Sequence, residues 1–195
     1  MMQKLSRDDL MPLEVYAAQR ADFRARVMAH KQNRRVLLGE HAALYFEDRL
    51  TMHYQVQEML RAERIFEAKD IDEELNAYNP MIPDGNNWKA TFMIEYPDEN
   101  ERRIALARLI DIEDRVWMQV AGHPPVYAIA DEDLERETDE KTSSVHFLRF
   151  ELDASMVSDA LAGKPISAGI DHENYRAAIE PLPASIADAL RADLA

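Results

Sequence analysis

The stretch from Ala43 to Phe66, ALYFEDRLTMHYQVQEMLRAERIF, constrains the fold of this chain more than any other segment. It begins with strand-forming apolar residues, passes through the acidic pair Glu47-Asp48, and continues with apolar side chains at helical spacing. The pattern predicts a strand, a sharp turn and then an amphipathic helix from about Thr51 to Asp70. With 195 residues the chain is long enough for one good core and short for two, so we predict a single domain over residues 1–195.

One carboxylate breaks the pattern of this helix. At 100° per residue the apolar side chains fall within a stripe of about 120°, and Glu63 lies near its middle. A buried carboxylate must be paired, protonated or bound to a metal, so we expect Glu63 to mark a functional site. Alternatively, the stripe is narrower and Glu63 reaches an arginine at its rim. The members of the predicted stripe are Met52, Val56, Met59, Leu60 and Phe66.

Charge and composition exclude several function classes. The net charge is −14, yet residues 1–39 carry eight Lys or Arg against four acids, which leaves −18 for the remainder. We therefore expect no binding to nucleic acid or to an anionic membrane, and we expect a basic helical segment, residues 1–35, to pack on the acidic body. Cysteine is absent, which excludes disulfides, thiolate nucleophiles and iron–sulfur ligation.

The sequence contains neither a membrane-spanning segment nor an export signal. No apolar run approaches the roughly 20 residues of a membrane span. The first residues, MMQKLSRDDLMPLE, carry acids where an export signal needs an apolar core. We therefore expect a cytoplasmic protein.

Beyond this stretch, turn residues and alternating segments predict a chain rich in hairpins. Gly39-Glu40 separates two short strands, and a second hairpin turns at residues 122–125. Residues 142–152 alternate so that His146 shares an almost purely apolar face with leucine and phenylalanine. The acidic block 131–141 lacks the ligand spacing of a calcium loop and is interpreted as a solvated helix or linker. The predicted class is α+β, with a mainly antiparallel sheet and helices packed mostly on one face.

Two groups of polar residues are candidates for ligand binding. The first is a segment rich in Asn, Pro and Gly from residue 76 to residue 88, interpreted as a binding loop or, alternatively, a plain surface loop. The second lies on the polar side of the predicted helix, where two arginines could read an anion or simply pair with the acidic chain. Together with Glu63 the candidates are His53, Gln57, Arg61, Arg64, Tyr78, Asn79, Asp84, Asn87 and Trp88.

A metal site is the alternative interpretation of the inward-facing polar residues. Imidazole and carboxylate ligands suit Fe, Mn or Zn, and such a site needs three or four protein groups around one ion. The candidate ligands are Glu63, His146, Glu47 and His53. Without a metal, His146 would be a neutral core histidine held by a buried acid. No nucleotide-binding or iron–sulfur motif is present, and no other standard catalytic signature appears.

Four long runs resemble an uncharacterised bacterial family, domain of unknown function 3501. They are LSRDDLMPLEVYAAQRADFRARVMAHKQNRRV, FEDRLTMHYQVQEMLRAERIF, AYNPMIPDGNNWKATFMIEYPDENERR and EKTSSVHFLRFEL, and the likeness covers nearly the whole chain. Members of that family tend to be encoded beside rubrerythrin-like proteins and an iron–sulfur oxidoreductase. The resemblance thus implies a redox-stress or iron-linked setting and carries no catalytic residue.

These observations favour an accessory or binding protein in a bacterial redox-stress or iron-handling system. The expected partner is a rubrerythrin-like or iron–sulfur oxidoreductase protein, and the expected assembly is a homodimer. One alternative is a metal-dependent enzyme with a buried Glu and His site. Another is a purely structural partner of an oxidoreductase, with no small-molecule site.

Overall fold

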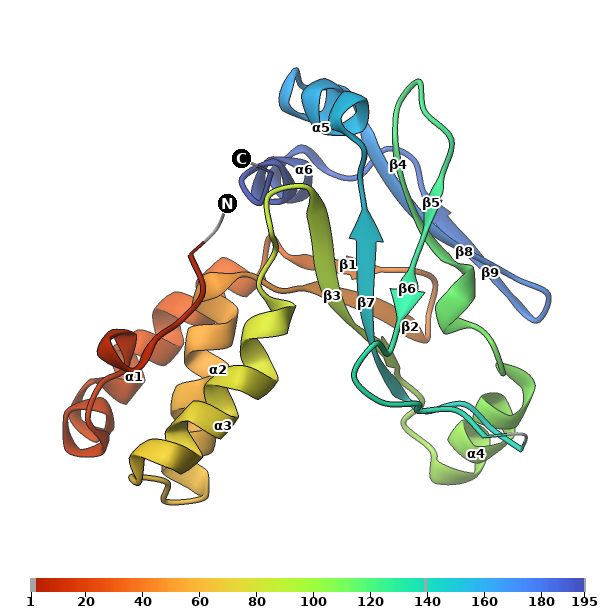
Figure 1. Cartoon of the computed structure of the whole chain (residues 1–195). Coiled ribbons are helices and arrows are strands. Elements are labelled where there is room, and N and C mark those ends of the chain that lie inside the picture. The colour runs from red at the N-terminus through yellow and green to blue at the C-terminus, as the bar shows by residue number, and fades with distance from the viewer. Residues whose placement is uncertain (1–2, 139, 195) are drawn as a thin grey trace.

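The computed structural model describes residues 3–138 and 140–194 (Figure 1). Its α-helices are α1 (Leu13–Lys31), α2 (Arg49–Ala62), α3 (Ala68–Tyr78), α4 (Glu99–Arg108), α5 (Ala154–Leu161) and α6 (Ala184–Arg191). Short 3-10 helices are η1 (Arg7–Asp9), η2 (Asn79–Met81) and η3 (Glu113–Arg115). The strands are β1 (Arg35–Leu37), β2 (Ala42–Phe46), β3 (Asn87–Ile94), β4 (Val116–Val120), β5 (Val126–Tyr127), β6 (Ile129–Ala130), β7 (Val145–Glu151), β8 (Ile166–His172) and β9 (Tyr175–Ile179). None of the described helices is both long enough and apolar enough to cross a membrane.

The strands form two antiparallel sheets, so the predicted α+β class is confirmed. One sheet has the order β1-β2-β3-β7-β6 and the other has the order β5-β4-β8-β9. The chain passes from one sheet to the other at Ala128, which separates β5 from β6. The strands thus divide between two sheets, where the sequence pattern suggested one.

The main hydrophobic core contains side chains from both sheets. Trp88 and Phe92 of β3 are fully buried in the same cluster as Met118 of β4 and Ile166 of β8. This burial follows from the alternation of side chains along a strand, because every second residue of β3 points into the core. The intervening residues of β3 point to the other face of the five-stranded sheet, and that face carries the site described below.

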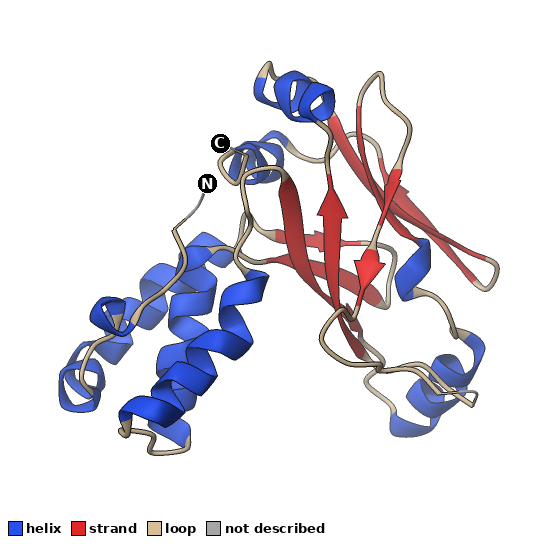
Figure 2. Cartoon of the chain, viewed as in Figure 1, coloured by secondary structure: helices blue, strands red, loops and turns tan. Residues whose placement is uncertain are grey.

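Helices α1, α2 and α3 gather beside the five-stranded sheet (Figure 2). They have small cores of their own, one of which joins Val56 and Leu60 of α2 to Leu75 of α3. Helix α1 is tied to α2 by an ion pair between Arg20 Nη2 and Glu58 Oε2 at 2.7 Å. The helices thus form a separate layer next to the sheet.

Helix α2 ends earlier than its apolar pattern predicts. Its last residue is Ala62, Arg64 adopts a left-handed conformation with φ 55°, and the Ile65 N–H donates to Leu60 O at 2.9 Å. This geometry closes the helix in the manner of a Schellman motif. Glu63 is therefore exposed, and the Phe66 side chain is 72% exposed. The expectation of a buried Glu63 is wrong, because the apolar periodicity was extended past the end of the helix.

The segment predicted as a long binding loop is mostly regular structure. Helix α3 continues to Tyr78, η2 follows directly, and β3 begins at Asn87, so only residues 82–86 connect them. Trp88 is fully buried, and its indole N–H donates to Leu190 O in α6 at 2.9 Å. Trp88 is thus a core residue that anchors α6 and is not part of a loop.

Candidate functional site

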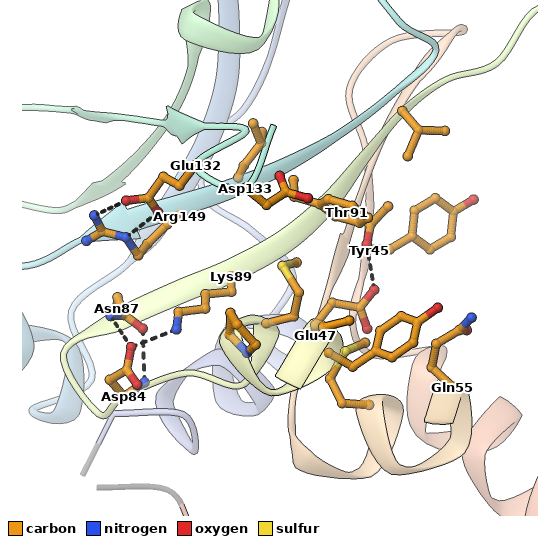
Figure 3. A pocket seen from close by; sticks show the side chains of 18 of the residues that line it. Tyr45, Glu47, Gln55, Asp84, Asn87, Lys89, Thr91, Glu132, Asp133 and Arg149 are labelled. Atoms are coloured by element: carbon orange, nitrogen blue, oxygen red, sulfur yellow. Dashed lines mark hydrogen bonds and ion pairs between the residues drawn. The ribbon is translucent and has the colours of Figure 1, made fainter. Parts of the chain in front are cut away.

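A cleft of about 1340 Å³ lies over the outer face of the five-stranded sheet. Strands β2, β3 and β7 provide its floor, α2, α3 and η2 line one side, and the segment after β6 lines the other. Figure 3 shows floor residues and their interactions. Residues of the floor include Tyr45, Glu47, Lys89, Thr91, Met93, Phe147 and Arg149.

Glu47 is the most enclosed carboxylate of this cleft. Glu47 is the residue directly after β2, and it is only 6% exposed. Its Oε1 accepts a hydrogen bond from Thr91 Oγ1 at 2.8 Å (Figure 3). Its backbone N–H bonds to Lys89 O at 2.8 Å, which extends the pairing of β2 with β3. Met52 and Met93 also line the cleft, so apolar surface accompanies the carboxylate. The floor therefore presents the Glu47 carboxylate, fixed by Thr91, within a partly apolar surface.

A lysine and an aspartate lie at one end of the floor. Lys89 Nζ donates to Asp84 Oδ2 at 2.7 Å and to Ile82 O at 2.9 Å, while Lys4 Nζ donates to Asp84 Oδ1 at 2.8 Å. Burial lowers the pKa of Lys89. Burial acts to raise the pKa of Asp84, but hydrogen bonds from the two lysines hold it well below its ordinary value. Asn87 Nδ2 adds a further bond to Asp84 Oδ2 at 3.1 Å.

Arg149 of β7 is held by two carboxylates. Its guanidinium forms a bidentate pair with Glu132, both bonds being 2.8 Å (Figure 3). It also contacts Glu151. At the opposite end of the floor, Tyr45 donates its hydroxyl to Glu95 at 2.7 Å, and burial together with this bond raises the pKa of Tyr45. Each end of the floor is therefore fixed by charged or polar pairs.

The cleft has an excess of negative charge. Four lysine or arginine side chains and six carboxylates line it, which gives a net charge of −2. The cations are Lys4, Lys31, Lys89 and Arg149, and the carboxylates are Glu47, Asp84, Glu95, Glu132, Asp133 and Glu151.

Only some of the predicted ligand-binding residues reach this cleft. Tyr78, Asp84 and Asn87 line it. Asn79 instead fixes the N-terminal segment, since its side chain exchanges hydrogen bonds of 2.8 and 2.9 Å with the backbone of Leu5. Trp88 faces the core on the other side of the sheet.

The polar side of α2 does not form the predicted anion site. Gln57 is fully buried and its Oε1 accepts from the Met11 N–H at 2.6 Å. His53 packs against the Phe23 ring with the ring centroids 5.2 Å apart, and burial lowers its pKa. Arg61 and Arg64 are exposed at the end of the helix. Gln57 and His53 are unavailable to a ligand because α1 and the segment before it cover this side of α2.

The four predicted metal ligands do not come together either. Glu47 lies in the cleft, His53 lies against α1, Glu63 is exposed, and His146 points into the core from the inner face of β7. Within the described residues, the potential metal-ligating cluster contains His146 with Glu113 and Asp131. The full burial of His146, expected from strand alternation, is confirmed.

Several residues of the cleft and of the cluster around His146 are not identified by local sequence patterns. Lys89, Thr91 and Arg149 occupy outward positions of alternating strands, and that alternation could have identified them once β3 was paired with β7. No spacing signal connects Glu113 or Asp131 to His146, because the three come from separate segments. Asp131 belongs to the acidic block that the sequence predicts to be solvated, yet its carboxylate accepts a hydrogen bond from His146 Nδ1 at 2.6 Å.

Comparisons with known proteins agree with this fold. A crystal structure described as a novel protein of unknown function from Burkholderia pseudomallei K96243 is similar to this chain, with 52% identity and a TM-score of 0.94. The similarity covers 99% of this chain and 100% of that one. The search among curated proteins returns no match. Residues 4–194 match the sequence model described as "Protein of unknown function (DUF3501)", and the chain therefore belongs to the DUF3501 family.

Proposed function

We propose that this protein is an accessory binding protein whose cleft receives a basic, amphipathic segment of a partner polypeptide. The observation that carries the proposal is Glu47, a carboxylate held by Thr91 on the floor of a cleft that also exposes methionine and aromatic side chains. A cationic group of the ligand would reach this carboxylate, while its apolar groups would cover Met93 and Phe147.

The size of the cleft favours an extended ligand. Small-molecule sites have volumes of about 300–1,000 Å³, whereas this cleft has about 1340 Å³. It is bordered by helices on one side and by the segment at Glu132 and Asp133 on the other. A peptide segment with alternating basic and apolar residues fits such a shape.

Charge complementarity favours a basic ligand. The lining has six carboxylates against four cations. Most of these carboxylates are in ion pairs, including Glu95 with Arg35 and Asp133 with Arg136, whereas Glu47 has no ion pair within the described residues and is held by Thr91. An anionic ligand would have to compete with carboxylates for Lys89 and Arg149, whereas a cationic ligand can reach Glu47 without displacing another cation.

The cellular setting is the part of the proposal that rests on the family. The resemblance implies a redox-stress or iron-handling system, with a rubrerythrin-like or iron–sulfur oxidoreductase protein as the partner. A metal-dependent enzyme built on Glu63 loses its basis because that side chain is exposed. A purely structural partner would leave the cleft empty, and the experiment below separates that alternative.

Fluorescence anisotropy with labelled synthetic peptides tests the proposal. We expect a ten-residue peptide of alternating Lys and Leu to bind at least about 10-fold more tightly than its Glu and Leu counterpart, because the lining is acidic. Ala77→Trp places a bulky ring on the exposed surface of α3 at the edge of the cleft, and it should weaken binding of the basic peptide by at least about 10-fold, a loss of about 1.4 kcal/mol.

Ala107→Trp on the exposed side of α4 is the matched control, since Ala107 is not among the residues that line the cleft. A second pair compares Glu47→Gln in the cleft with Glu99→Gln at the start of α4, because both remove one negative charge. Equal binding by all four variants would mean that the basic peptide is attracted by the net charge alone and would contradict the proposal.

A further inference from the structure

A second cluster of polar side chains lies inside the fold, away from the cleft. It forms where η3, the residue after β6 and the start of β7 meet. His146 is fully buried there, and the side chains of Glu113 and Asp131 are each 9% exposed. One potential ligand atom from each of the three residues lies within 4.8 Å of the others. The cluster belongs to the inner side of the sheet, whereas the cleft lies on the outer side.

The Nδ1 side of His146 is occupied by Asp131. The Asp131 carboxylate bonds to Nδ1 at 2.6 Å, and it is itself held by the Phe147 N–H at 2.9 Å and by Arg136 at 3.1 Å. Because a carboxylate accepts the bond, Nδ1 carries a proton. In the neutral tautomer with the proton on Nδ1 alone, the lone pair of Nε2 is available to a ligand. Histidines that bind metals are oriented in this way by a carboxylate on the other ring nitrogen.

Three oxygen atoms surround Nε2 on the opposite side of the ring, which makes four potential ligand atoms with Nε2 itself. From His146 Nε2 the distances are 2.8 Å to Thr142 Oγ1, 3.0 Å to Ser143 O and 3.6 Å to Glu113 Oε2. Thr142 Oγ1 lies 3.1 Å from Glu113 Oε2. Ligands that bind one ion at about 2.0–2.2 Å lie about 3.0–3.5 Å from one another, so these separations are close to those of a coordination shell.

In this neutral tautomer, the hydrogen-bond inventory of the four atoms is short of protons. With Nδ1 protonated, the Nε2 lone pair, the Glu113 carboxylate and the Ser143 carbonyl all accept, and the Thr142 hydroxyl is the donor among the four groups. A cation at this position would satisfy every acceptor at once.

We propose that this cluster is a binding site for one first-row divalent metal ion. His146 Nε2 and the Glu113 carboxylate are the principal ligands, Thr142 Oγ1 and Ser143 O complete the shell, and Asp131 orients the imidazole. One nitrogen with several oxygens and no sulfur suits Mn²⁺, Fe²⁺ or Zn²⁺ and disfavours Cu⁺. The ion would fasten η3 and the segment before β7 to the sheet, a role that is independent of ligand binding in the cleft.

Metal titration of the full-length, tag-free protein after chelator treatment tests this site. CoCl₂ followed by visible absorption, and MnCl₂ followed by electron paramagnetic resonance, should each show one ion per chain. We expect bound metal to raise the melting temperature, since it binds the folded state. Glu113→Gln keeps the shape of the side chain and should weaken affinity by at least about 10-fold, and Asp131→Asn by about 10-fold or more.

Glu101→Gln, on the exposed face of α4, is the control and should bind the metal as the wild type does. His146→Gln should abolish binding, and near-UV circular dichroism establishes whether each variant is folded. If the wild type binds no stoichiometric metal, or if the folded Glu113→Gln variant binds with unchanged affinity, the cluster is a structural hydrogen-bond network and the inference is overturned.

Discussion

At the scale of single residues, the apolar periodicity of the predicted helix gives the wrong burial for Glu63. The apolar stripe includes Glu63 only if the helix continues to residue 66, but the helix ends at Ala62 and the chain turns at Arg64. Nothing in the local sequence marks this end, because there is no glycine where the left-handed residue occurs. The tertiary packing of α2 and α3 decides the boundary.

The exposed position of Glu63 gives a first prediction. Glu63→Gln should change the free energy of unfolding by less than about 0.5 kcal/mol, because surface substitutions without partners have effects of that size. Urea unfolding at pH 7 measures the change. A loss above 1 kcal/mol would mean that the carboxylate has a partner in solution.

Asp84 should behave differently from an exposed aspartate. Asp84→Asn removes the carboxylate that pairs with buried Lys89, so we expect a loss of about 1–3 kcal/mol in unfolding free energy. Asp72→Asn is the matched control, because Asp72 pairs with Arg7 where both side chains are about half exposed. Urea unfolding should show a loss below about 1 kcal/mol for the control. Equal losses for the two variants would refute the structural role of the Asp84 pair.

At the scale of elements, local patterns predicted most helices and strands but not their partners. The hairpin of β1 and β2 and the inward face of β7 follow from alternation, and both are confirmed by the antiparallel register and by burial. The loop before β3 was misjudged because Asn and Pro near residues 76–80 are accommodated by the end of α3 and by η2. Composition alone cannot distinguish a loop from a helix end of this kind.

The contact between α1 and α2 gives a prediction that depends on pH. Hydrogen bonds from Arg20 and Tyr16 lower the pKa of Glu58 to about 2. Its contribution to stability is therefore present above its ordinary value of 4.5 and is lost as the pH falls towards 2. Glu58→Gln should cost about 1–3 kcal/mol at pH 7 and progressively less below pH 4.

Urea unfolding of wild type and variant at pH 7 and at pH 3 checks this dependence. Glu14→Gln, on the exposed face of α1, is the control and should have little effect at either pH. If the cost of Glu58→Gln is the same at both pH values, the carboxylate is not the source of the stabilisation.

The C-terminal helix gives a further prediction. Trp88→Phe removes the bond from the indole to Leu190 O and leaves space in the core, so we expect a loss of about 2–4 kcal/mol in unfolding free energy. Chemical denaturation followed by far-UV circular dichroism measures it. A loss below 0.5 kcal/mol would show that α6 is held by other contacts.

At the scale of the whole molecule, the sequence predicts the class but not the arrangement of its layers. Alternating strands identify inward and outward residues, yet they do not tell which strands share a sheet. The second sheet buries the inner face of β3, and this leaves its outer face to meet α2 and α3 across the cleft. The basic N-terminal segment packs on the acidic remainder of the chain through ion pairs. Arg20 pairs with Glu58, and Arg34 pairs with Asp193.

The most direct test of the central claim is a methyl NMR titration of protein labelled with ¹³C at the methionine methyl groups. Met52, Met81 and Met93 line the cleft, whereas Met118 and Met156 lie in the core between the sheets. Adding the basic Lys and Leu peptide should shift the first three resonances in proportion to occupancy and leave the other two unchanged. Saturable binding with no shift at Met52, Met81 or Met93 would contradict the assignment of the cleft as the ligand site.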